Sequence, residues 1–347
     1  MTKRINETSQ RKKEHIELCL TDEVSFRLKT NGFDRYEFIH YAITEVDISK
    51  ITFNRILFNK AINYPFLISS MTGGTENATS INQRLAVIAE ELKIPIGVGS
   101  QRQALENKEF HHSYRIIRDS APSVPVLANI GAAQLVQSNN IKDILCLIEM
   151  LQADALIIHF NPLQELMQEN GDTNFAGALN KIEKLCKQSP VSVIAKEVGA
   201  GINKHAAIKL LDCGVSGIDV AGAGGTSWAG VELKRSKKDN PIFWDWGLPT
   251  SYCLKEIFQL KNKYEFILIG SGGINTADDL AKAFAFGSDL AASARIILQK
   301  LLNENEQAVI DLITGWFDNL KKIMFLTGSQ NLDEFKKGKL IKKEDLF

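Results

Sequence analysis

The sequence predicts a single α/β domain, a (β/α)8 TIM barrel, and three observations support this prediction. The chain has 347 residues, and the α/β barrel commonly holds about 250 residues plus insertions in one domain. Eight short apolar runs recur along it, each of the length expected for a strand that is buried on both faces. The first four runs are about 30 residues apart, which is the length of one βα unit.

The predicted strands each end in small or polar residues. In chain order they are Phe66–Ser70, Ile96–Gly99, Val126–Asn129, Ala155–His159, Val193–Lys196, Gly217–Val220, Phe266–Gly270 and Leu290–Ser293. Amphipathic patterns between them predict helices over Ile81–Leu92, Ile141–Leu151, Phe175–Cys186, Lys204–Leu211 and Ala277–Phe286. Strands that alternate with helices form a parallel sheet, which eight units can close into a barrel.

The two ends of the chain depart from this alternation. Residues 1–60 are expected to form an N-terminal extension that covers one end of the barrel and contributes substrate-binding residues. Residues 61–347 are expected to form the barrel with a C-terminal helical tail, in which Asn303–Phe325 is the predicted helix. No stretch has the composition of a linker, so we expect no second domain.

Composition narrows the classes of function. The net charge is zero and no long basic run occurs, which argues against nucleic acid as the main partner. The five cysteines are dispersed without CxxC spacing, a pattern typical of reduced thiols in the cytoplasm. The polar N-terminus does not resemble a signal peptide, and no apolar run approaches the roughly 20 residues of a membrane helix. We therefore expect a cytoplasmic protein without membrane contact.

The residues that follow the strands are the candidates for chemistry, because barrel active sites lie there. After strand seven, Gly272 and Gly273 allow backbone N–H groups to approach a phosphate closely. The backbone of Ser293, Ala294 and Arg295 after strand eight would complete the phosphate site. The alternative is that the glycines only form a strand-to-helix turn.

Three further strand ends carry groups suited to a cofactor ring. Lys196 ends an apolar strand, where it is either a cation or Schiff-base amine facing a ligand or one half of a structural ion pair. The Asn129 amide either pairs with ring carbonyl and N–H groups or forms a turn. The glycine-rich loop 221–228 is either plain flexible chain or a lid, and Trp228 and Glu232 behind it favour the lid.

A second group of residues carries charge. His159 alone would be an ordinary core histidine, but Asn161, Gln164 and Glu165 follow it within six residues. Glu165 is either a Mg²⁺ ligand or a carboxylate at a helix N-terminus. The run at residues 11–15 is either a solvated charge run or, through Arg11 and Lys12 together with Arg102, a diphosphate site.

Nine motifs run in a fixed order from residue 11 to about residue 295. They are RKKEH, SSMTGGT, GVGSQR, ANIGA, HFNPLQE, AKEVGAG, DVAGAGGTSWAGVE, DWGLPT and GSGGINTADDLAKAFAFGSDLAASA. In this order they resemble the FMN-dependent type 2 isopentenyl-diphosphate isomerases. HFNPLQE and AGAGGTSWAGVE are specific to that family, whereas many flavin barrels share the glycine pair of strand seven.

The resemblance implies a set of roles. FMN would contact Met71, Thr72, Gly73, Ser100, Asn129, Lys196 and Thr226, and its phosphate would bind Gly272, Gly273, Ser293 and Ala294. The substrate would contact Arg11, Lys12, His15, Ser100, Gln101, Arg102, His159, Asn161, Gln164 and Trp228. Glu165 would bind Mg²⁺, and Gln164, Glu232 and His159 would take part in catalysis.

The implied reaction interconverts isopentenyl and dimethylallyl diphosphate in isoprenoid biosynthesis. FMN would be reduced by NADPH or a similar donor, and the protein would be a homotetramer or homo-octamer. No side chain is an obvious acid for an alkene carbon, so reduced FMN is the expected acid or base at N5, and Gln164 and Glu232 are expected to relay the second proton.

One stretch departs from the family pattern. Family members often carry a basic residue and a glycine after the strand-seven glycines, where this chain has Asn275, Thr276 and Ala277. FMN binding is therefore expected to depend more on backbone N–H groups.

Two other classes remain as alternatives. An FMN-dependent hydroxy-acid oxidase or dehydrogenase needs a base such as a histidine at the strand-seven end, where this chain has GSGGIN. Nucleotide dehydrogenases of similar fold use a cysteine on the loop after strand six, and that loop has none here. A non-catalytic phosphate-binding barrel would not need the polar groups found at seven strand ends.

Overall fold

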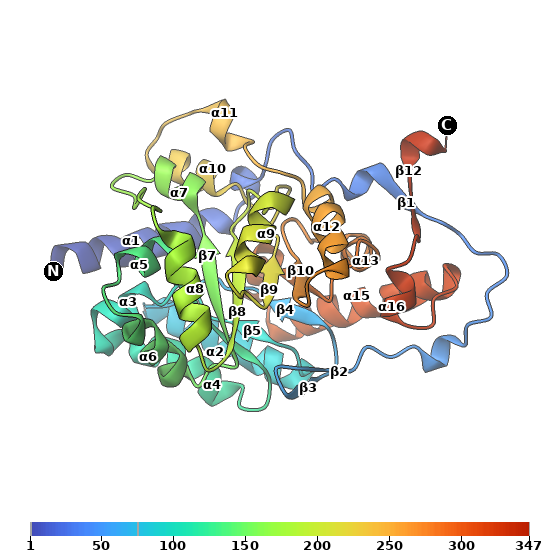
Figure 1. The fold of residues 1–347 in the computed structure, drawn as a ribbon, viewed down its shortest axis with the longest axis horizontal. Coiled ribbons are helices and arrows are strands. Elements are labelled where there is room, and N and C mark those ends of the chain that lie inside the picture. Colours follow the sequence, from blue (N-terminus) through green and yellow to red (C-terminus); the bar gives the residue numbers. More distant parts are fainter. Residues whose placement is uncertain (1, 75, 347) are drawn as a thin grey trace.

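The computed structural model describes residues 2–74 and 76–346, and a closed barrel of eight parallel strands forms its centre (Figure 1). In chain order the barrel strands are β4 (Phe66–Ile68), β5 (Ile96–Gly97), β6 (Val126–Gly131), β7 (Ala155–Phe160), β8 (Ser192–Glu197), β9 (Gly217–Asp219), β10 (Ile267–Gly270) and β11 (Leu290–Ser293). The barrel closes where β11 pairs with β4, with Ser293 beside Ile68. The predicted fold and all eight predicted strands are confirmed. Thr75, at the end of the SSMTGGT motif, lies outside the described residues.

Helices surround the barrel and follow its strands. They are α2 (Glu76–Leu92), α3 (Arg102–Glu106), α4 (His111–Ser120), α5 (Ala132–Gln137), α6 (Ile141–Leu151), α7 (Pro162–Met167), α8 (Ala178–Gln188), α9 (Lys204–Asp212), α10 (Trp228–Arg235), α11 (Pro241–Trp244), α12 (Thr250–Phe258), α13 (Ala277–Ala285) and α14 (Arg295–Asn303). The five predicted helices are present. The long gap between the sixth and seventh strands is filled by α10, α11 and α12.

Caps explain where the observed helix limits differ from the predicted ones. Helix α8 begins at Ala178 instead of Phe175, because Gly177 precedes it in a left-handed conformation with φ +80°. The tail helix α15 (Glu306–Leu326) begins three residues after the predicted start, because the Asn305 side chain accepts a hydrogen bond from the N–H of Ala308 and caps it. Asn303 instead ends α14.

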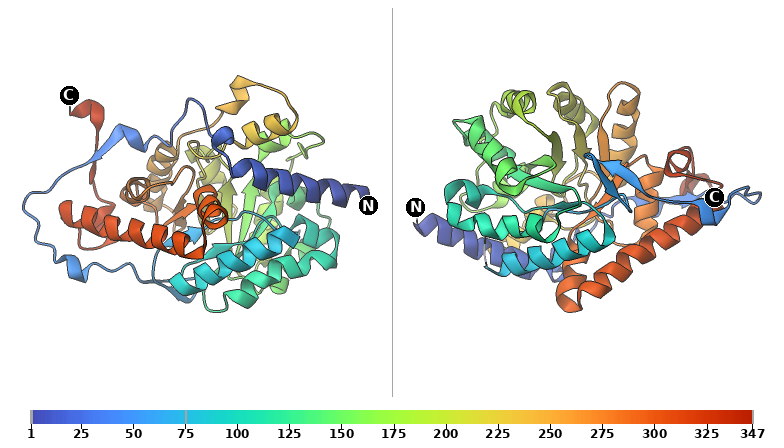
Figure 2. Two further views of the ribbon diagram at one scale, coloured as in Figure 1. Left: turned by 180° about the vertical axis from the view of Figure 1, so that it is seen from behind. Right: turned by 90° about the horizontal axis from the view of Figure 1, so that it is seen from below.

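The first 62 residues contact both ends of the barrel, because a hairpin that straddles the end of the extension closes the end opposite to α1. Helix α1 (Thr2–Cys19) contributes residues to the cavity at the carboxyl ends of the strands. The hairpin of β2 (Arg55–Leu57) and β3 (Lys60–Ile62) closes the opposite end, and the view from below shows it in front of the barrel (Figure 2). Its two-residue turn, Phe58–Asn59, has the positive φ angles typical of tight hairpins.

The hairpin closes the barrel with apolar side chains. Leu57 and Ile62 are buried against inward-facing strand residues of the barrel, which are Leu67, Leu127, Ile157, Ile194, Ile269 and Leu290. Strand β1 (Tyr36–Phe38) precedes the hairpin in the chain. It pairs antiparallel with β12 (Leu340–Lys342) of the tail, which follows α16 (Leu332–Phe335). The extension is therefore bound to the barrel at several separate places along its length.

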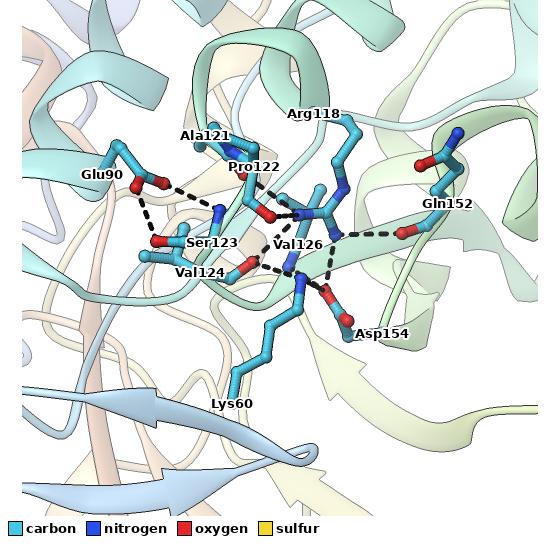
Figure 3. A network of polar contacts seen from close by, with 10 residues as sticks. All are labelled: Lys60, Glu90, Arg118, Ala121, Pro122, Ser123, Val124, Val126, Gln152 and Asp154. Carbon is cyan, nitrogen blue, oxygen red and sulfur yellow. Dashed lines mark hydrogen bonds and ion pairs between the residues drawn. The ribbon is translucent and has the colours of Figure 1, made fainter.

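A polar network fastens the hairpin to the amino ends of the strands (Figure 3). One oxygen of Asp154 accepts hydrogen bonds from Arg118 Nη2 at 2.5 Å, from Lys60 Nζ at 3.1 Å and from the Val126 N–H at 2.8 Å. Arg118 also donates to the carbonyl groups of Ala121, Pro122, Val124 and Gln152. The network joins β3, α4 and the starts of β6 and β7.

Among the described residues, no helix combines the length and the apolar character that crossing a membrane would require.

Candidate active site

The carboxyl ends of all eight barrel strands open into one cavity, which α1 also lines. Among the predicted site residues, those that line this cavity are Arg11, Lys12, His15, Met71, Thr72, Ser100, Arg102, Asn129, His159, Asn161, Gln164, Glu165, Lys196, Thr226, Trp228, Gly272, Gly273, Ser293 and Ala294. Gly73, Gln101 and Glu232 are not among the lining residues. The structure thus brings residues 11–15 to the same place as the strand ends.

One end of the cavity is formed by bare backbone. Gly272 and Gly273 have φ angles of +100° and +74°, and a Cβ on either would clash with the carbonyl groups of Gly222 or Gly224. The following helix α13 is capped, because Thr276 Oγ1 accepts from the N–H of Asp279 at 3.1 Å and Asp279 Oδ2 accepts from the N–H of Thr276 at 3.0 Å. The glycines therefore form both a close turn and a part of the cavity wall that consists of backbone.

Two buried hydroxyl groups on the cavity wall have no hydrogen-bond partner. They are Ser70 Oγ and Thr72 Oγ1, which follow β4. Burying a polar group without a partner is costly, so both hydroxyls suit a polar ligand such as a flavin ring. Together with the glycine end, they show that the residues present fit FMN.

Lys196, at the end of β8, lines the cavity and also has a carboxylate neighbour. Its Nζ donates to the Glu197 carbonyl at 2.7 Å and lies 3.7 Å from Asp219 Oδ2. Ser271 Oγ donates to the other oxygen of Asp219. Burial raises the pKa of Asp219, and the nearby Lys196 ammonium opposes that shift. Lys196 therefore forms a structural ion pair and also lines the cavity, so the two roles that the sequence left as alternatives occur together.

Asn129 and His159 are fixed by hydrogen bonds on neighbouring strands. Asn129 Nδ2 donates to the Val98 carbonyl at 3.1 Å, which directs its Oδ1 towards His159 Nδ1 at 2.8 Å. Burial and the neighbouring Lys196 lower the pKa of His159 to about 4, so the imidazole is neutral near pH 7. With its proton on Nδ1, the ring offers Nε2 as an acceptor.

Gln101 lies behind this pair and does not reach the cavity. Its side chain is completely buried, and its Oε1 accepts a hydrogen bond from the Asn129 N–H at 2.9 Å. The structure therefore does not place Gln101 among the groups that can touch a substrate, although the sequence grouped it with Ser100 and Arg102. Sequence adjacency could not reveal that this side chain points backwards into the wall.

Glu165 lies near the start of α7 and is buried. Its Oε1 accepts from Asn161 Nδ2 at 3.0 Å, and its Oε2 accepts from the Asp172 N–H at 2.7 Å and from Gln168 Nε2 at 3.3 Å. Asn161 Oδ1 has no partner. Within the described residues, no three His, Cys, Asp or Glu side chains form a metal cluster. A single carboxylate fits Mg²⁺ when substrate phosphates supply other ligands.

A group of cations lies at the charged end of the cavity. Arg102 pairs with Glu106 at 3.3 Å and with Asp172 at 2.9 Å. Burial and the neighbouring Arg102 lower the pKa of Arg11, against the effects of Glu232 and Glu165. Burial, with a contribution from Arg11, lowers the pKa of Lys12 to about 7. Carboxylates compensate Arg102, whereas the lowered pKa values of Arg11 and Lys12 show that their charged forms would be stabilised by an added anion such as a diphosphate.

Glu232 is a buried carboxylate that joins α10 to α1. It accepts from His15 Nε2 at 2.8 Å, from Gln164 Nε2 at 3.3 Å and from Arg235 Nη1 at 2.6 Å. Burial favours a raised pKa for Glu232, but the hydrogen bonds and charges of His15 and Arg235 outweigh it and lower the pKa. His15 also packs edge-on against Trp228, with the ring centroids 5.1 Å apart.

Sequence reasoning missed three residues at this site. Ser70 belonged to a predicted strand, and its position at the strand end was the available signal. Arg235 pairs with both Glu232 and Glu14, and its spacing of three from Glu232 on a helix was a usable sign. The third is the side chain of Arg295, whose backbone alone was predicted at the site; it lines the cavity and donates to Ser25 Oγ at 2.8 Å. That contact comes from the extension, so nothing local in the sequence indicated it.

Comparisons with known proteins identify the family and agree with the fold. The family model described as FMN-dependent dehydrogenase matches residues 127–342. A protein of Chlorobium phaeobacteroides named isopentenyl-diphosphate delta-isomerase is 43% identical, over 97% of this chain and 96% of its own length. A protein of a Nostoc species with the same name is 45% identical, over 95% of both chains.

Solved structures share the architecture at low sequence identity. A putative lactate oxidase of Pediococcus acidilactici matches with a TM-score of 0.69 and 16% identity, covering 97% of this chain and 94% of that one. A mutant flavocytochrome b2 matches with a TM-score of 0.68 and 18% identity, covering 94% of this chain and 82% of that one. At these identities the likeness establishes the barrel fold alone.

Proposed function

The chain belongs to the type 2 isopentenyl-diphosphate delta-isomerases, and from this premise we propose that it interconverts isopentenyl and dimethylallyl diphosphate with reduced FMN and Mg²⁺. The observation that carries the proposal is the division of one cavity into two ends. The glycine end with Ser70, Thr72 and Lys196 suits a flavin. The cationic end with Arg11, Lys12 and Glu165 suits a diphosphate with its metal.

The flavin is proposed to lie with its phosphate at Gly272, Gly273, Ser293 and Ala294. Met71, Thr72, Ser100, Asn129 and Thr226 would contact the ring system, and Gly73, which does not line the cavity, would support them from behind. Asn275 lines the cavity beside these glycines, and Arg295 adds a cation to the cavity wall. Bound and reduced by NADPH, FMN would supply the acid–base group that faces the reacting carbons.

The diphosphate is proposed to bind among Arg11, Lys12, Ser100 and Arg102, with His15, His159 and Asn161 at its side. Glu165 would hold Mg²⁺ against the phosphate oxygens. Gln101 would act from behind the wall by fixing Asn129. The cations and Mg²⁺ would neutralise the diphosphate and fix the hydrocarbon tail in one orientation. Holding the reacting carbons in place in this way would raise the rate. Trp228 would line the hydrocarbon side.

Gln164 and Glu232 are proposed to carry the second proton. Gln164 lines the cavity and donates to Glu232, which in turn accepts from His15. This chain of hydrogen bonds gives a proton a path from the cavity to a buried carboxylate without bulk water. His159, whose Nδ1–H is held by Asn129, would present Nε2 to the substrate.

The rival function is oxidation of a 2-hydroxy acid by the same flavin. It needs a base at the end of β10, where the described residues are Ser271, Gly272 and Gly273. The cationic end also contains two guanidinium groups and an ammonium, a set that suits a diphosphate better than a single carboxylate.

Purified protein loaded with FMN tests the proposal. With Mg²⁺ and NADPH, we expect flavin absorbance to bleach and isopentenyl diphosphate to be converted into dimethylallyl diphosphate without net consumption of reductant. O₂ consumption with a 2-hydroxy acid, in protein that leaves isopentenyl diphosphate unchanged, would contradict it. A protein that binds no flavin would contradict it as well.

A further inference from the structure

Tyr114 of α4 lies outside the cavity but touches two of its residues. The side chain is fully buried, and its hydroxyl donates to the Ser100 carbonyl at 2.8 Å. The same hydroxyl accepts a hydrogen bond from Lys12 Nζ at 3.2 Å. Burial raises the pKa of Tyr114 far above its usual range, so the hydroxyl keeps its proton and its donor role.

Lys12 reaches Tyr114 from a different part of the chain. Its Nζ also donates to the Gly73 carbonyl at 2.5 Å and lies 3.5 Å from the Ser100 carbonyl. These three oxygens come from the loops after β4 and β5 and from α4, so the barrel provides a binding site for the Lys12 ammonium of the extension. An ammonium has three N–H donors; the Gly73 carbonyl and the Tyr114 hydroxyl accept two of them, which leaves one for the substrate.

The ring of Tyr114 also packs against the backbone at this ammonium-binding site. A Cβ on Gly73 would clash with the Tyr114 ring, so only glycine allows the backbone to approach the ring this closely. The Lys12 ammonium lies beyond the hydroxyl, 5.7 Å from the ring centroid. The position of Lys12 therefore depends on one side chain that itself cannot reach the cavity.

We propose that Tyr114 is a positioning residue for the substrate diphosphate, because its hydroxyl holds the Lys12 ammonium and the Ser100 backbone at the charged end of the cavity. This inference rests on the proposed function, which makes Lys12 a ligand of the diphosphate. Tyr114 contributes no atom to the substrate and acts through Lys12 and Ser100.

The ionisation of Lys12 gives the proposal a measurable signature. The charged groups that face Lys12 are Arg11 on its own helix and Glu106 and Arg102 on α3, with Tyr114 on α4 as the neutral acceptor. Burial lowers the pKa of Lys12 to about 7. Loss of an acceptor for the charged form would lower this pKa further, so Lys12 would lose its proton at a lower pH.

The test is Tyr114→Phe, which keeps the ring and removes the hydroxyl. We expect KM for isopentenyl diphosphate at pH 7 to rise by about tenfold, the loss of a hydrogen bond to a charged group. We expect kcat to change by less than about twofold, because the reacting carbons are untouched. The alkaline limb of kcat/KM should move to lower pH. Assays use saturating FMN and Mg²⁺.

Two controls separate this role from a structural one. Tyr264→Phe also removes a hydroxyl that donates one hydrogen bond, to Asp212 on the surface, and should leave KM and the pH profile unchanged. In Lys12→Met protein, which has no ammonium, Tyr114→Phe should raise KM by less than about twofold.

Two results would overturn the proposal. One is an unchanged KM and pH profile in Tyr114→Phe. The other is an equal rise of KM in the Lys12→Met background, since Tyr114 would then act independently of Lys12. Wild-type protein that fails to convert isopentenyl diphosphate would instead contradict the proposed function, so the two failures are distinguishable.

Discussion

At the scale of single residues, Glu232 accepts hydrogen bonds from His15, Gln164 and Arg235. Its substitution tests the proposed proton path through Gln164. We expect Glu232→Ala to lower kcat by about 100-fold or more, the usual contribution of a positioned acid or base. FMN affinity should be unchanged, because Glu232 does not line the cavity. Steady-state kinetics and flavin titration measure both quantities.

Glu14→Gln is the matched control for this change. Glu14 also pairs with Arg235, but its carboxylate accepts from Gln10 where Glu232 accepts from Gln164, so kcat should change by less than about threefold. Wild-type turnover in Glu232→Ala would remove Glu232 from the proton path.

Glu165 is the residue expected to control the requirement for metal. Glu165→Gln loses the carboxylate charge, and we expect the Mg²⁺ concentration for half-maximal activity to rise by about tenfold or more. The exposed Glu169, four residues further on, gives the control Glu169→Gln, which should show wild-type dependence. An unchanged dependence in Glu165→Gln would mean that the metal binds elsewhere.

His159 gives the substrate-free protein a dependence of stability on acid. Burial lowers its pKa from the ordinary value of 6.5 to about 4 in the folded chain, so the unfolded chain binds the extra proton first. Its contribution to stability is therefore present above about pH 6.5 and is lost as the pH falls towards 4. Denaturant unfolding of wild type and His159→Gln should diverge across this window. Parallel curves from pH 7 to pH 4 would contradict a buried, neutral His159.

At the residue scale the sequence indicated which residue types gather at the strand ends, but not the direction of each side chain. Lys196 illustrates this limit, because its pairing with Asp219 depends on strands that the chain reaches about 20 residues apart. Gln101 is a second case, since its burial is set by β6 and α6. The roles assigned to individual residues stay predictions.

At the scale of elements, the strands were predictable because each is a continuous apolar run that the barrel buries on both faces. The β2–β3 hairpin could not be predicted from the sequence, because an alternation of apolar and polar residues over only three positions often arises by chance. Its alternation is short, and its burial depends on the barrel end that it covers.

Asp154 tests how firmly that hairpin is fastened. Asp154→Asn removes the charge that Arg118 and Lys60 share and leaves two cations close together. We expect the free energy of unfolding to fall by about 3 kcal/mol, measured by chemical denaturation. The exposed helical pair of Glu183 and Lys187 gives the control, Glu183→Gln, for which a much smaller loss is expected because solvent screens the pair. Equal losses in both variants would show that the network adds no stability.

At the scale of the whole molecule, the sequence placed the extension and the barrel in one domain but not their mutual arrangement. Helix α1 reaches the strand ends through contacts such as His15 with Glu232 and Lys12 with Gly73, which join residues more than 60 positions apart. Such distant pairings leave no local pattern. The homotetramer or homo-octamer and the cytoplasmic location stay predictions.

The central claim is that a reduced flavin and a magnesium-bound diphosphate share one cavity and that the reaction needs no net electron transfer. The most direct measurement is conversion of isopentenyl diphosphate under anaerobic conditions by protein whose FMN has been reduced beforehand, with Mg²⁺ and without NADPH. We expect many turnovers per flavin while the flavin stays reduced. Equal turnover with oxidised flavin, or one equivalent of flavin oxidised per product formed, would contradict the account.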